Sequence, residues 1–378
     1  MIDLLRSAFP TALDPQLQQA VQRDWIVRQA KDGLAEARRS PEYATVNLAR
    51  WFRKNRSLGS RDRRMVSELV HGVVRHEAVL LRAGARSPED LIVSVADLFA
   101  GDRFDDLSFA SPAEDLATAL NVPAPVAVEW LETLGAEQAA AYAASINHRP
   151  TVDLRVNHLK SSRAELKSML ADEGIETTEG VAVDTHLEVI GRANLTQTKA
   201  FKAGLFEVQD RSSQAFCDAL PLGRGERVLD LCAGAGGKSL ALAARGARVT
   251  ATDIRSHALE ELQKRARRAG ATISIEEPRP APLVVVDAPC SGSGRLRRNP
   301  MLRWGLTDAT HLETQVDLLQ AAAGLVLPEG HLVYATCSLL LRENQHPTPA
   351  GFELVGETTL WPHVDGSDGF YWRIMRRV

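Results

Sequence analysis

The chain contains few cysteines, and no two of them are close in sequence. Its four thiols, Cys217, Cys232, Cys290 and Cys337, include no CxxC pair, so we expect neither a zinc cluster nor another metal site. The N-terminal residues lack the basic region, apolar stretch and cleavage site of a secretory signal. We therefore expect a cytoplasmic protein with reduced thiols, in which an isolated cysteine is either packed in the core or used in chemistry.

Long apolar runs and a strong charge imbalance are also missing. No run of about 18 apolar residues occurs, so we expect no membrane span. The formal net charge of −3 gives no overall signature of nucleic-acid binding. Basic residues do gather locally, and the group Arg295, Arg297 and Arg298 draws interest because it follows Cys290 closely. The ordinary composition and the length of 378 residues predict a globular protein of two or three domains.

The chain divides into three segments that differ in their pattern of apolar and polar residues. Residues 1–146 predict an all-helical domain, in which Ser60 is the expected N-cap of a helix that ends near Leu81. The segment 101–112 is rich in Asp, Ser and Gly and predicts a loop. Residues 147–210 predict a small α+β module, with a helix over 161–174 that ends at Gly174. Residues 211–378 alternate strands and helices, which predicts an α/β domain with a parallel sheet covered on both faces.

Three apolar runs in this last part end in chemically useful residues. The run RVLDLCAGAGGKS ends in a glycine loop, LVVVDAPC ends in Cys290, and HLVYATC ends in Cys337. Helices are expected between them at 238–245, 257–269 and 307–326. Open α/β sheets bind ligands at the carboxyl ends of their strands. We therefore expect the loop and both thiols to meet at one edge of the sheet.

The glycine loop predicts a cofactor that contains a nucleoside. Gly234, Gly236 and Gly237 lie between a strand and a helix, where backbone N–H groups approach a ligand closely. Asp253 ends the next predicted strand, where its carboxylate can accept from both ribose hydroxyls. Neither the GxGxxG dinucleotide pattern nor the GxxxxGK[ST] phosphate loop is present. This disfavours NAD and ATP and favours S-adenosylmethionine.

The two strand-end thiols suit methylation of a pyrimidine carbon. Carbon 5 of cytosine is a poor nucleophile until a thiolate adds to carbon 6, and such covalent catalysis divides one hard step into two. Asp287 lies three residues before Cys290, where its carboxyl group can hydrogen-bond the cytosine ring. Buried packing is the expected role of Cys217, and Cys232 is expected to pack rather than react.

These segments resemble a known family. The blocks DLCAGAGGK, DAPCSGSGRLRRNP and ATCSLLLREN look like signature blocks of the RsmB/Sun family of RNA cytosine carbon-5 methyltransferases. FEVQDRSSQ (206–214) and LRVN (154–157) resemble upstream blocks of that family. LGSRDRRMVSELVHGVVRH (58–76) is similar to the NusB-like domain of its rRNA-modifying branch. The resemblance implies a Rossmann-like methyltransferase domain, a preceding RRM-like module and a NusB-like RNA-binding domain at the N-terminus.

The resemblance also implies residue roles. Cys337 would be the nucleophile, Cys290 would assist release of the product, and Lys238 would sit between cofactor and base. The S-adenosylmethionine site would be lined by Cys232, Ala233, Gly234, Ala235, Gly236, Gly237, Lys238, Asp253 and Asp287. Arg295, Arg297 and Arg298 would hold phosphates of small-subunit ribosomal RNA, the implied partner of a monomeric enzyme.

Two segments depart from the family pattern. The stretch 270–282 is short where the family places an acid beside the adenine, and Glu276 or Glu277 is the candidate replacement. The stretch after Asn344 is also abbreviated. Two other functions remain open. A DNA cytosine methyltransferase would share the Pro-Cys thiol, although the second strand-end thiol disfavours it. A non-catalytic RNA-binding assembly factor is favoured by the short 270–282 segment.

Overall fold

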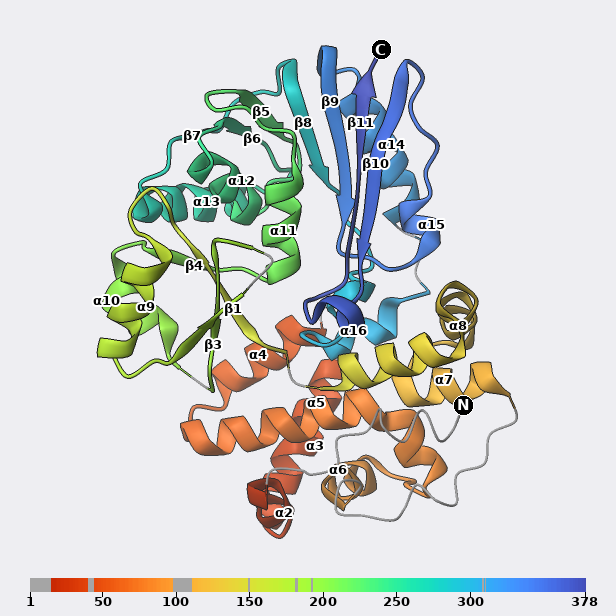
Figure 1. Cartoon of the computed structure of the whole chain (residues 1–378). Coiled ribbons are helices and arrows are strands. Elements are labelled where there is room, and N and C mark those ends of the chain that lie inside the picture. Colours follow the sequence, from red (N-terminus) through yellow and green to blue (C-terminus); the bar gives the residue numbers. More distant parts are fainter. Residues whose placement is uncertain are drawn as a thin grey trace. The chain divides into compact units, whose positions relative to one another are not determined.

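The computed structural model describes residues 15–39, 44–97, 111–148, 150–180, 183–191, 193–307, 309 and 311–378. Most of the predicted loop 101–112 lies outside these residues. The chain divides into two compact units (Figure 1). The first comprises residues 1–150, 291–309 and 362–366, and the second comprises 151–290, 310–361 and 367–378. These units cut across the predicted division at 146 and 210, which stays a prediction.

The first unit is helical throughout its described part. Its elements are α2 (Pro15–Val21), α3 (Asp24–Arg38), α4 (Ala44–Lys54), α5 (Ser60–Arg82), α6 (Pro88–Asp97), α7 (Pro112–Leu120), α8 (Ala124–Asn147), the 3-10 turns η3 (Ser293–Arg295) and η4 (Pro300–Gly305), and α16 (Pro362–Asp365). The stripe from Met65 to Val74 is buried in its core, as the three- and four-residue spacing predicts. The N-cap prediction was wrong by one residue: Gly59 is the cap, and Ser60 is the first helical residue. No described helix is long and apolar enough to cross a membrane.

A buried arginine ties the segment 291–309 to these helices. Arg303, only 1% exposed, donates from Nε to the Leu120 carbonyl at 2.6 Å. Its Nη2 donates to Asn147 Oδ1 at 3.0 Å. A buried guanidinium requires several acceptors, and these bonds supply them. The residues that follow Cys290 therefore belong to the helical unit.

The second unit begins with a four-stranded antiparallel sheet. Its elements are β1 (Val152–Val156), α9 (Arg163–Asp172), β2 (Thr177–Glu179), β3 (His186–Val189), the 3-10 turn η2 (Leu195–Gln197), α10 (Lys199–Lys202) and β4 (Phe206–Val208). The strand order is β2-β3-β1-β4, the βαββαβ arrangement expected of the RRM-like module. Ser162 and Glu165 form a capping box at the start of α9, and Gly174, at φ +75°, follows its end as predicted.

The rest of this unit is a seven-stranded sheet with helices on both faces. Its elements are α11 (Arg211–Ala219), β5 (Arg227–Asp230), α12 (Gly237–Ala244), β6 (Arg248–Ala251), α13 (Ser256–Ala269), β7 (Ile273–Ser274), β8 (Ala281–Asp287), α14 (His311–Ala323), β9 (Val326–Thr336), α15 (Leu341–Asn344), β10 (Phe352–Leu360) and β11 (Phe370–Arg377). The order is β10-β11-β9-β8-β5-β6-β7, and β11 runs antiparallel to both of its neighbours.

Successive side chains of β8 point to opposite faces of the sheet, so each face has its own hydrophobic core. Leu283 and Val285 pack in the core that contains residues of α11 and α12, whereas Val284 and Val286 pack against α14. The predicted parallel sheet with helices on both faces is confirmed for β5 to β9, and β11 adds antiparallel pairs with β9 and β10. The helix expected over 307–326 was too long at its C-terminal end, because β9 begins at Val326.

Candidate active site

The glycine loop follows β5 and caps α12. Gly236 is the N-cap at φ +82°, a backbone conformation that favours glycine. A Cβ atom at this position would lie 2.5 Å from Cγ of Leu262, so packing against α13 also requires glycine. The Gly234 amide donates to Oδ2 of Asp253 at 2.8 Å. This hydrogen bond holds the glycine loop next to Asp253, the residue whose carboxylate the sequence predicts to bind ribose.

Asp230, the last residue of β5, is a buried carboxylate that the sequence analysis did not single out. Ser239 Oγ donates to its Oδ2 at 2.6 Å, while Oδ1 has no hydrogen-bond partner in the described structure. Burial raises the pKa of Asp230 to about 6. The residue lines a pocket of about 200 Å³ together with Cys232, Ala233 and Lys238. An acceptor of this kind fits a cationic ligand group.

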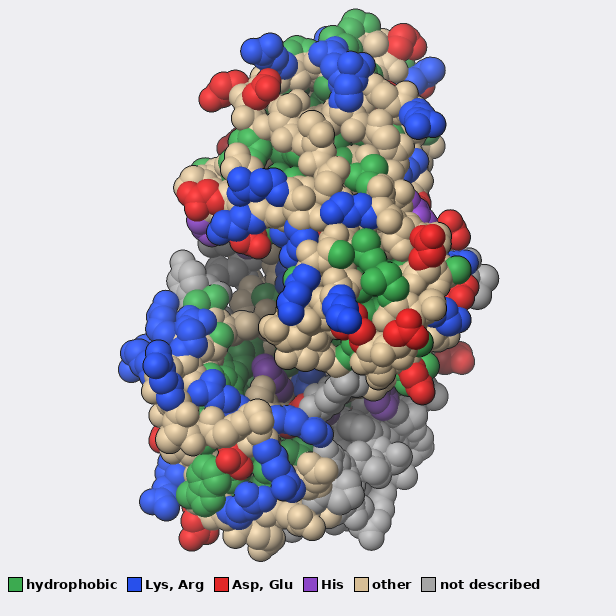
Figure 2. All heavy atoms as spheres, turned by 90° about the vertical axis from the view of Figure 1, so that its left-hand side faces the viewer, with side chains coloured by type: hydrophobic (Ala, Val, Ile, Leu, Met, Phe, Trp, Pro, Cys, Tyr) green, Lys and Arg blue, Asp and Glu red, His purple; other side chains and the backbone are tan. Residues whose placement is uncertain are grey.

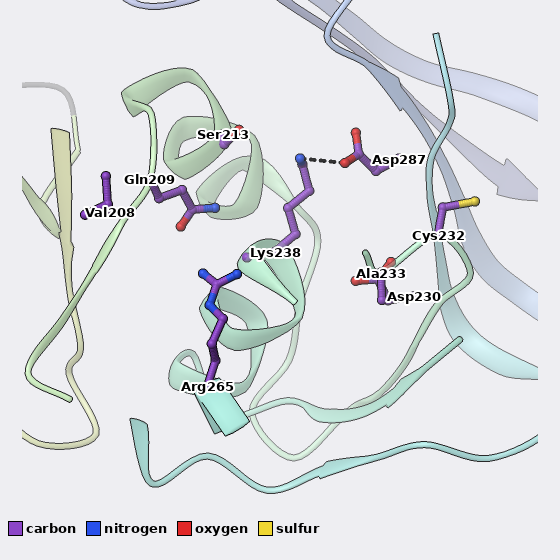
Figure 3. Close-up of a pocket in the computed structure, with 10 residues that line it drawn as sticks. Val208, Gln209, Ser213, Asp230, Cys232, Ala233, Lys238, Arg265 and Asp287 are labelled. Carbon is purple, nitrogen blue, oxygen red and sulfur yellow. Dashed lines mark hydrogen bonds and ion pairs between the residues drawn. The ribbon is translucent and has the colours of Figure 1, made fainter. Parts of the chain in front are cut away.

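Lys238 and Asp287 face each other across this pocket (Figure 3). Lys238 Nζ lies 2.7 Å from Asp287 Oδ2 and 4.9 Å from the centre of the Phe370 ring. Burial lowers the pKa of Lys238, but the charge of Asp287 and the hydrogen bond that Lys238 donates to it outweigh burial and leave the pKa above its ordinary value. Lys238 is therefore a cation that orients Asp287 and is not a proton acceptor.

The opposite wall of the pocket comes from the segment between the two sheets. Gln209 lies on the side of the pocket opposite the loop (Figure 3). Arg155 Nε donates to Gln209 Oε1 at 2.6 Å. Arg265 Nη1 donates to the Ala235 carbonyl at 2.7 Å, and its Nη2 lies 3.0 Å from Oε2 of Glu207. Arg265 thus links β4 to the glycine loop. Gln209 lies in the block FEVQDRSSQ, whose sequence pattern does not indicate a role for this residue.

A second cavity, of about 590 Å³, lies on the other side of the loop. Asp253, Ile254, Glu276 and Glu277 are among its lining residues. Ile254 is fully exposed, as an apolar surface for a planar ring would be. Burial raises the pKa of Asp253, but hydrogen bonds from Arg255 and from the Gly234 amide outweigh it and leave the pKa lowered. Both acidic candidates for the short segment therefore line the same cavity as Asp253.

The two strand-end thiols meet in space. Cys290 Sγ and Cys337 Sγ are 3.4 Å apart, although 47 positions separate them in the chain, and both side chains are partly exposed. This is the convergence that the strand pattern predicts. Cys217 is buried, and burial raises its pKa to about 12. The sulfur of Cys232 points away from Lys238 in Figure 3, and burial raises its pKa to about 12.

The basic group after Cys290 is divided. Arg295 is exposed and Arg298 is partly exposed, whereas Arg297 is buried and donates from Nη2 to the Gly366 carbonyl at 3.2 Å. Arg297 therefore has a structural contact within the helical unit. Phosphate binding remains a proposal, and its accessible candidates are Arg295 and Arg298. Among the described residues, no group of His, Cys, Asp and Glu is arranged to hold a metal ion.

Comparison with known proteins finds matches in the segments described above. Residues 218–351 match the family described as 16S rRNA methyltransferase RsmB/F, and residues 122–194 match the ferredoxin-like domain of RsmF/B-like methyltransferases. The "Probable ribosomal RNA small subunit methyltransferase B" of Bacillus subtilis is 32% identical over 70% of this chain and 68% of its own length. The protein of the same name from Synechocystis sp. is 34% identical over 57% of this chain and 54% of its own length.

Solved structures share the fold. The crystal structure of PH0851 covers 97% of this chain and 99% of its own, with a TM-score of 0.72 and 22% identity. NSun6 from Pyrococcus horikoshii, solved with SFG, covers 66% of this chain and 96% of its own, with a TM-score of 0.57 and 18% identity. With a relative above 30% identity over two thirds of both chains, and with both signature domains matched, this chain belongs to the RsmB/F family of ribosomal RNA methyltransferases, the family also called RsmB/Sun.

Proposed function

We propose that the protein transfers a methyl group from S-adenosylmethionine to carbon 5 of a cytosine in small-subunit ribosomal RNA. The observation that carries the proposal is the 3.4 Å contact between the sulfurs of Cys290 and Cys337. A covalent mechanism of this kind can use two thiols, one to attack the base and one to assist release of the methylated product. Core packing alone does not require two thiols at the same sheet edge.

The residues around the glycine loop fit the donor. The unpartnered Oδ1 of buried Asp230 suits its ammonium group, and the cavity lined by Asp253 and Ile254 suits its ribose and adenine. Glu276 and Glu277 offer carboxylates for the adenine amino group. The donor supplies an electrophilic methyl group when it is bound. SFG, carried by the structural neighbour NSun6, is an analogue of this donor.

The proposed chemistry assigns one step to each thiol. The Cys337 sulfur adds to carbon 6 of cytosine, and the electron pair moves to carbon 5, which takes the methyl group. A base then takes up the carbon-5 proton, the electrons of that C–H bond re-form the double bond between carbons 5 and 6, and the Cys337 sulfur leaves carbon 6 as a thiolate, with Cys290 assisting this release. Asp287, oriented by Lys238, holds the ring during addition.

A basic surface on the helical unit supports an RNA substrate. Around the end of α4 and the start of α5, Arg50, Arg53, Lys54, Arg56 and Arg61 are all exposed. Figure 2, which views the molecule toward this junction, shows Lys and Arg side chains gathered there. Such clusters attract phosphates and make binding depend on salt.

The test is methyl transfer with the purified full chain. The protein is incubated with S-adenosylmethionine labelled in the methyl group and with 16S ribosomal RNA, and digested nucleosides are identified by mass spectrometry. We expect 5-methylcytidine. A methyl group on a nitrogen or a ribose would contradict the proposal. Transfer to DNA alone would support the DNA enzyme, and RNA binding without transfer would support the assembly factor.

A further inference from the structure

The loops that carry the two thiols are joined by a buried polar network. Its centre is Glu343 in α15, which is 2% exposed. Ser338 Oγ donates to Glu343 Oε2, and Gln315 Nε2 lies 3.4 Å from Glu343 Oε1. Gln315 Nε2 also donates to the Pro289 carbonyl at 2.9 Å. Ser338 follows Cys337 directly, and Pro289 precedes Cys290 directly, so the network connects the two loops through three side chains.

The Cys337 side of the network is held on both flanks of the thiol. Thr336 Oγ1 donates to Asn344 Oδ1 at 2.7 Å, and Asn344 Nδ2 donates to the Ser338 carbonyl at 3.0 Å. Ser338 Oγ also accepts the Leu340 amide at 3.1 Å. Thr336 and Ser338 are 0% exposed, whereas the thiol between them is partly exposed. The backbone on both sides of Cys337 is therefore held by buried hydrogen bonds, while the Cys337 side chain stays partly exposed.

On the Cys290 side, the network includes the Gln315 amide. Gln315, on α14, is 0% exposed, and its Oε1 lies 3.0 Å from Nε2 of His346. The Pro289 carbonyl needs a donor, so the amide orientation follows from its two neighbours: the NH₂ group faces Pro289 and the oxygen faces His346.

We propose that Gln315 and Glu343 are positioning residues that set the distance between the two sulfurs, Gln315 through Pro289 and Glu343 through Ser338. Neither residue lines the donor pocket or the cavity that contains Asp253.

The inference rests on the proposed function, and its first test separates the roles of the two loops. Gln315→Met keeps the length of the side chain and removes its three hydrogen bonds, to Pro289, Glu343 and His346. Ser338→Ala removes the donor to Glu343. In single-turnover reactions with RNA, we expect Gln315→Met to form the protein–RNA adduct within threefold of the wild-type rate but to resolve it at least tenfold more slowly. We expect Ser338→Ala to slow adduct formation at least tenfold, without adduct accumulation.

The matched control is Gln320→Met, which changes an exposed glutamine on the same helix and should leave both rates unchanged. Equal slowing of both steps in Gln315→Met and Ser338→Ala, with a lowered Tm, would show a purely structural role and overturn the proposal. If Gln315→Met does not fold, Ser338→Ala alone decides, because adduct formation at the wild-type rate would refute the coupling.

A second readout does not depend on methylation. Diamide oxidises two neighbouring thiols to a disulfide, takes up both hydrogens and is thereby reduced to a hydrazine. Peptide mapping follows closure of the bond between Cys290 and Cys337 in the full chain. We expect Gln315→Met and Ser338→Ala to close it at least fivefold more slowly than the wild type and Gln320→Met. Unchanged closure would overturn the positioning role, whereas slower closure in a protein that forms no RNA adduct would refute the proposed function alone.

Discussion

Replacing Asp230 by Asn should stabilise the protein and weaken donor binding at the same time. Burial raises the pKa of Asp230 from 3.8 to about 6, so the folded state holds the ionised carboxylate at a cost. A shift of about 2 units corresponds to ~3 kcal/mol. The folded state binds the proton more tightly than the unfolded state does. The cost is therefore absent below about pH 4, grows as the pH rises to about 6 and is constant above that.

Asparagine keeps the shape of the side chain and an oxygen for Ser239, but it carries no charge. At about pH 8, Asp230→Asn should therefore have a free energy of unfolding up to ~3 kcal/mol larger and an apparent Tm several degrees higher. At about pH 4 the two proteins should have equal stability. Affinity for S-adenosylmethionine should fall about 10- to 100-fold, because a charged hydrogen bond is worth ~1.5–3 kcal/mol.

Thermal scans across this pH range and calorimetric titration with the donor measure both effects. Asp253→Asn is the control with the opposite sign. The pKa of Asp253 is lowered, because hydrogen bonds from Arg255 and Gly234 outweigh burial, so its ionised form stabilises the fold and the variant should melt lower. A variant Asp230→Asn that is no more stable at about pH 8 than at about pH 4, relative to wild type, would refute the reasoning about the buried carboxylate.

Three further substitutions probe the framework of the site. Gly236→Ala should lower the Tm and abolish donor binding, because φ is +82° and the new Cβ would lie 2.5 Å from Leu262; circular dichroism and calorimetry would detect this, and normal binding would contradict it. Arg255→Ala should tighten donor binding by up to about fivefold, since it frees Asp253 from an exposed ion pair worth ~1 kcal/mol or less; weaker binding in a titration would argue against ribose binding there. Glu207→Gln leaves the partly buried guanidinium groups of Arg265 and Arg268 without their carboxylate partner. Urea denaturation should show that the free energy of unfolding falls by ~3 kcal/mol or more, and a fall below ~1 kcal/mol would contradict this role of Glu207.

The sheet edge that carries the glycine loop and the two thiols was predictable because local patterns determine it. Apolar runs that end in glycine or cysteine give the strand ends, and parallel pairing brings strand ends together. Cys290 and Cys337 meet for this reason. The antiparallel direction of β11 was not predictable, because the alternation of apolar and polar residues in a strand is the same whichever way the strand runs. The start of β9 was also missed, since Gly324 and the residues after it fit an apolar helix as well as a strand.

Buried polar groups were the main omission. Asp230 ends an apolar run and reads as an ordinary strand terminus, and only the structure shows that Oδ1 is buried without a partner. Arg297 reads as part of a basic cluster, yet the helical unit buries it. Gln315 lies in an amphipathic helix, where its sequence does not reveal that it faces Pro289. Such contacts depend on residues distant in sequence, which local pattern cannot report.

Trapping of the protein–RNA adduct in cysteine variants tests the central claim most directly. Full-length wild type, Cys290→Ala and Cys337→Ala are incubated with 16S ribosomal RNA and S-adenosylmethionine, denatured and separated by size, and the adducted peptide is identified by mass spectrometry. We expect Cys290→Ala to accumulate an adduct through Cys337, and Cys337→Ala to form none. An adduct that persists in Cys337→Ala and disappears in Cys290→Ala would contradict the account.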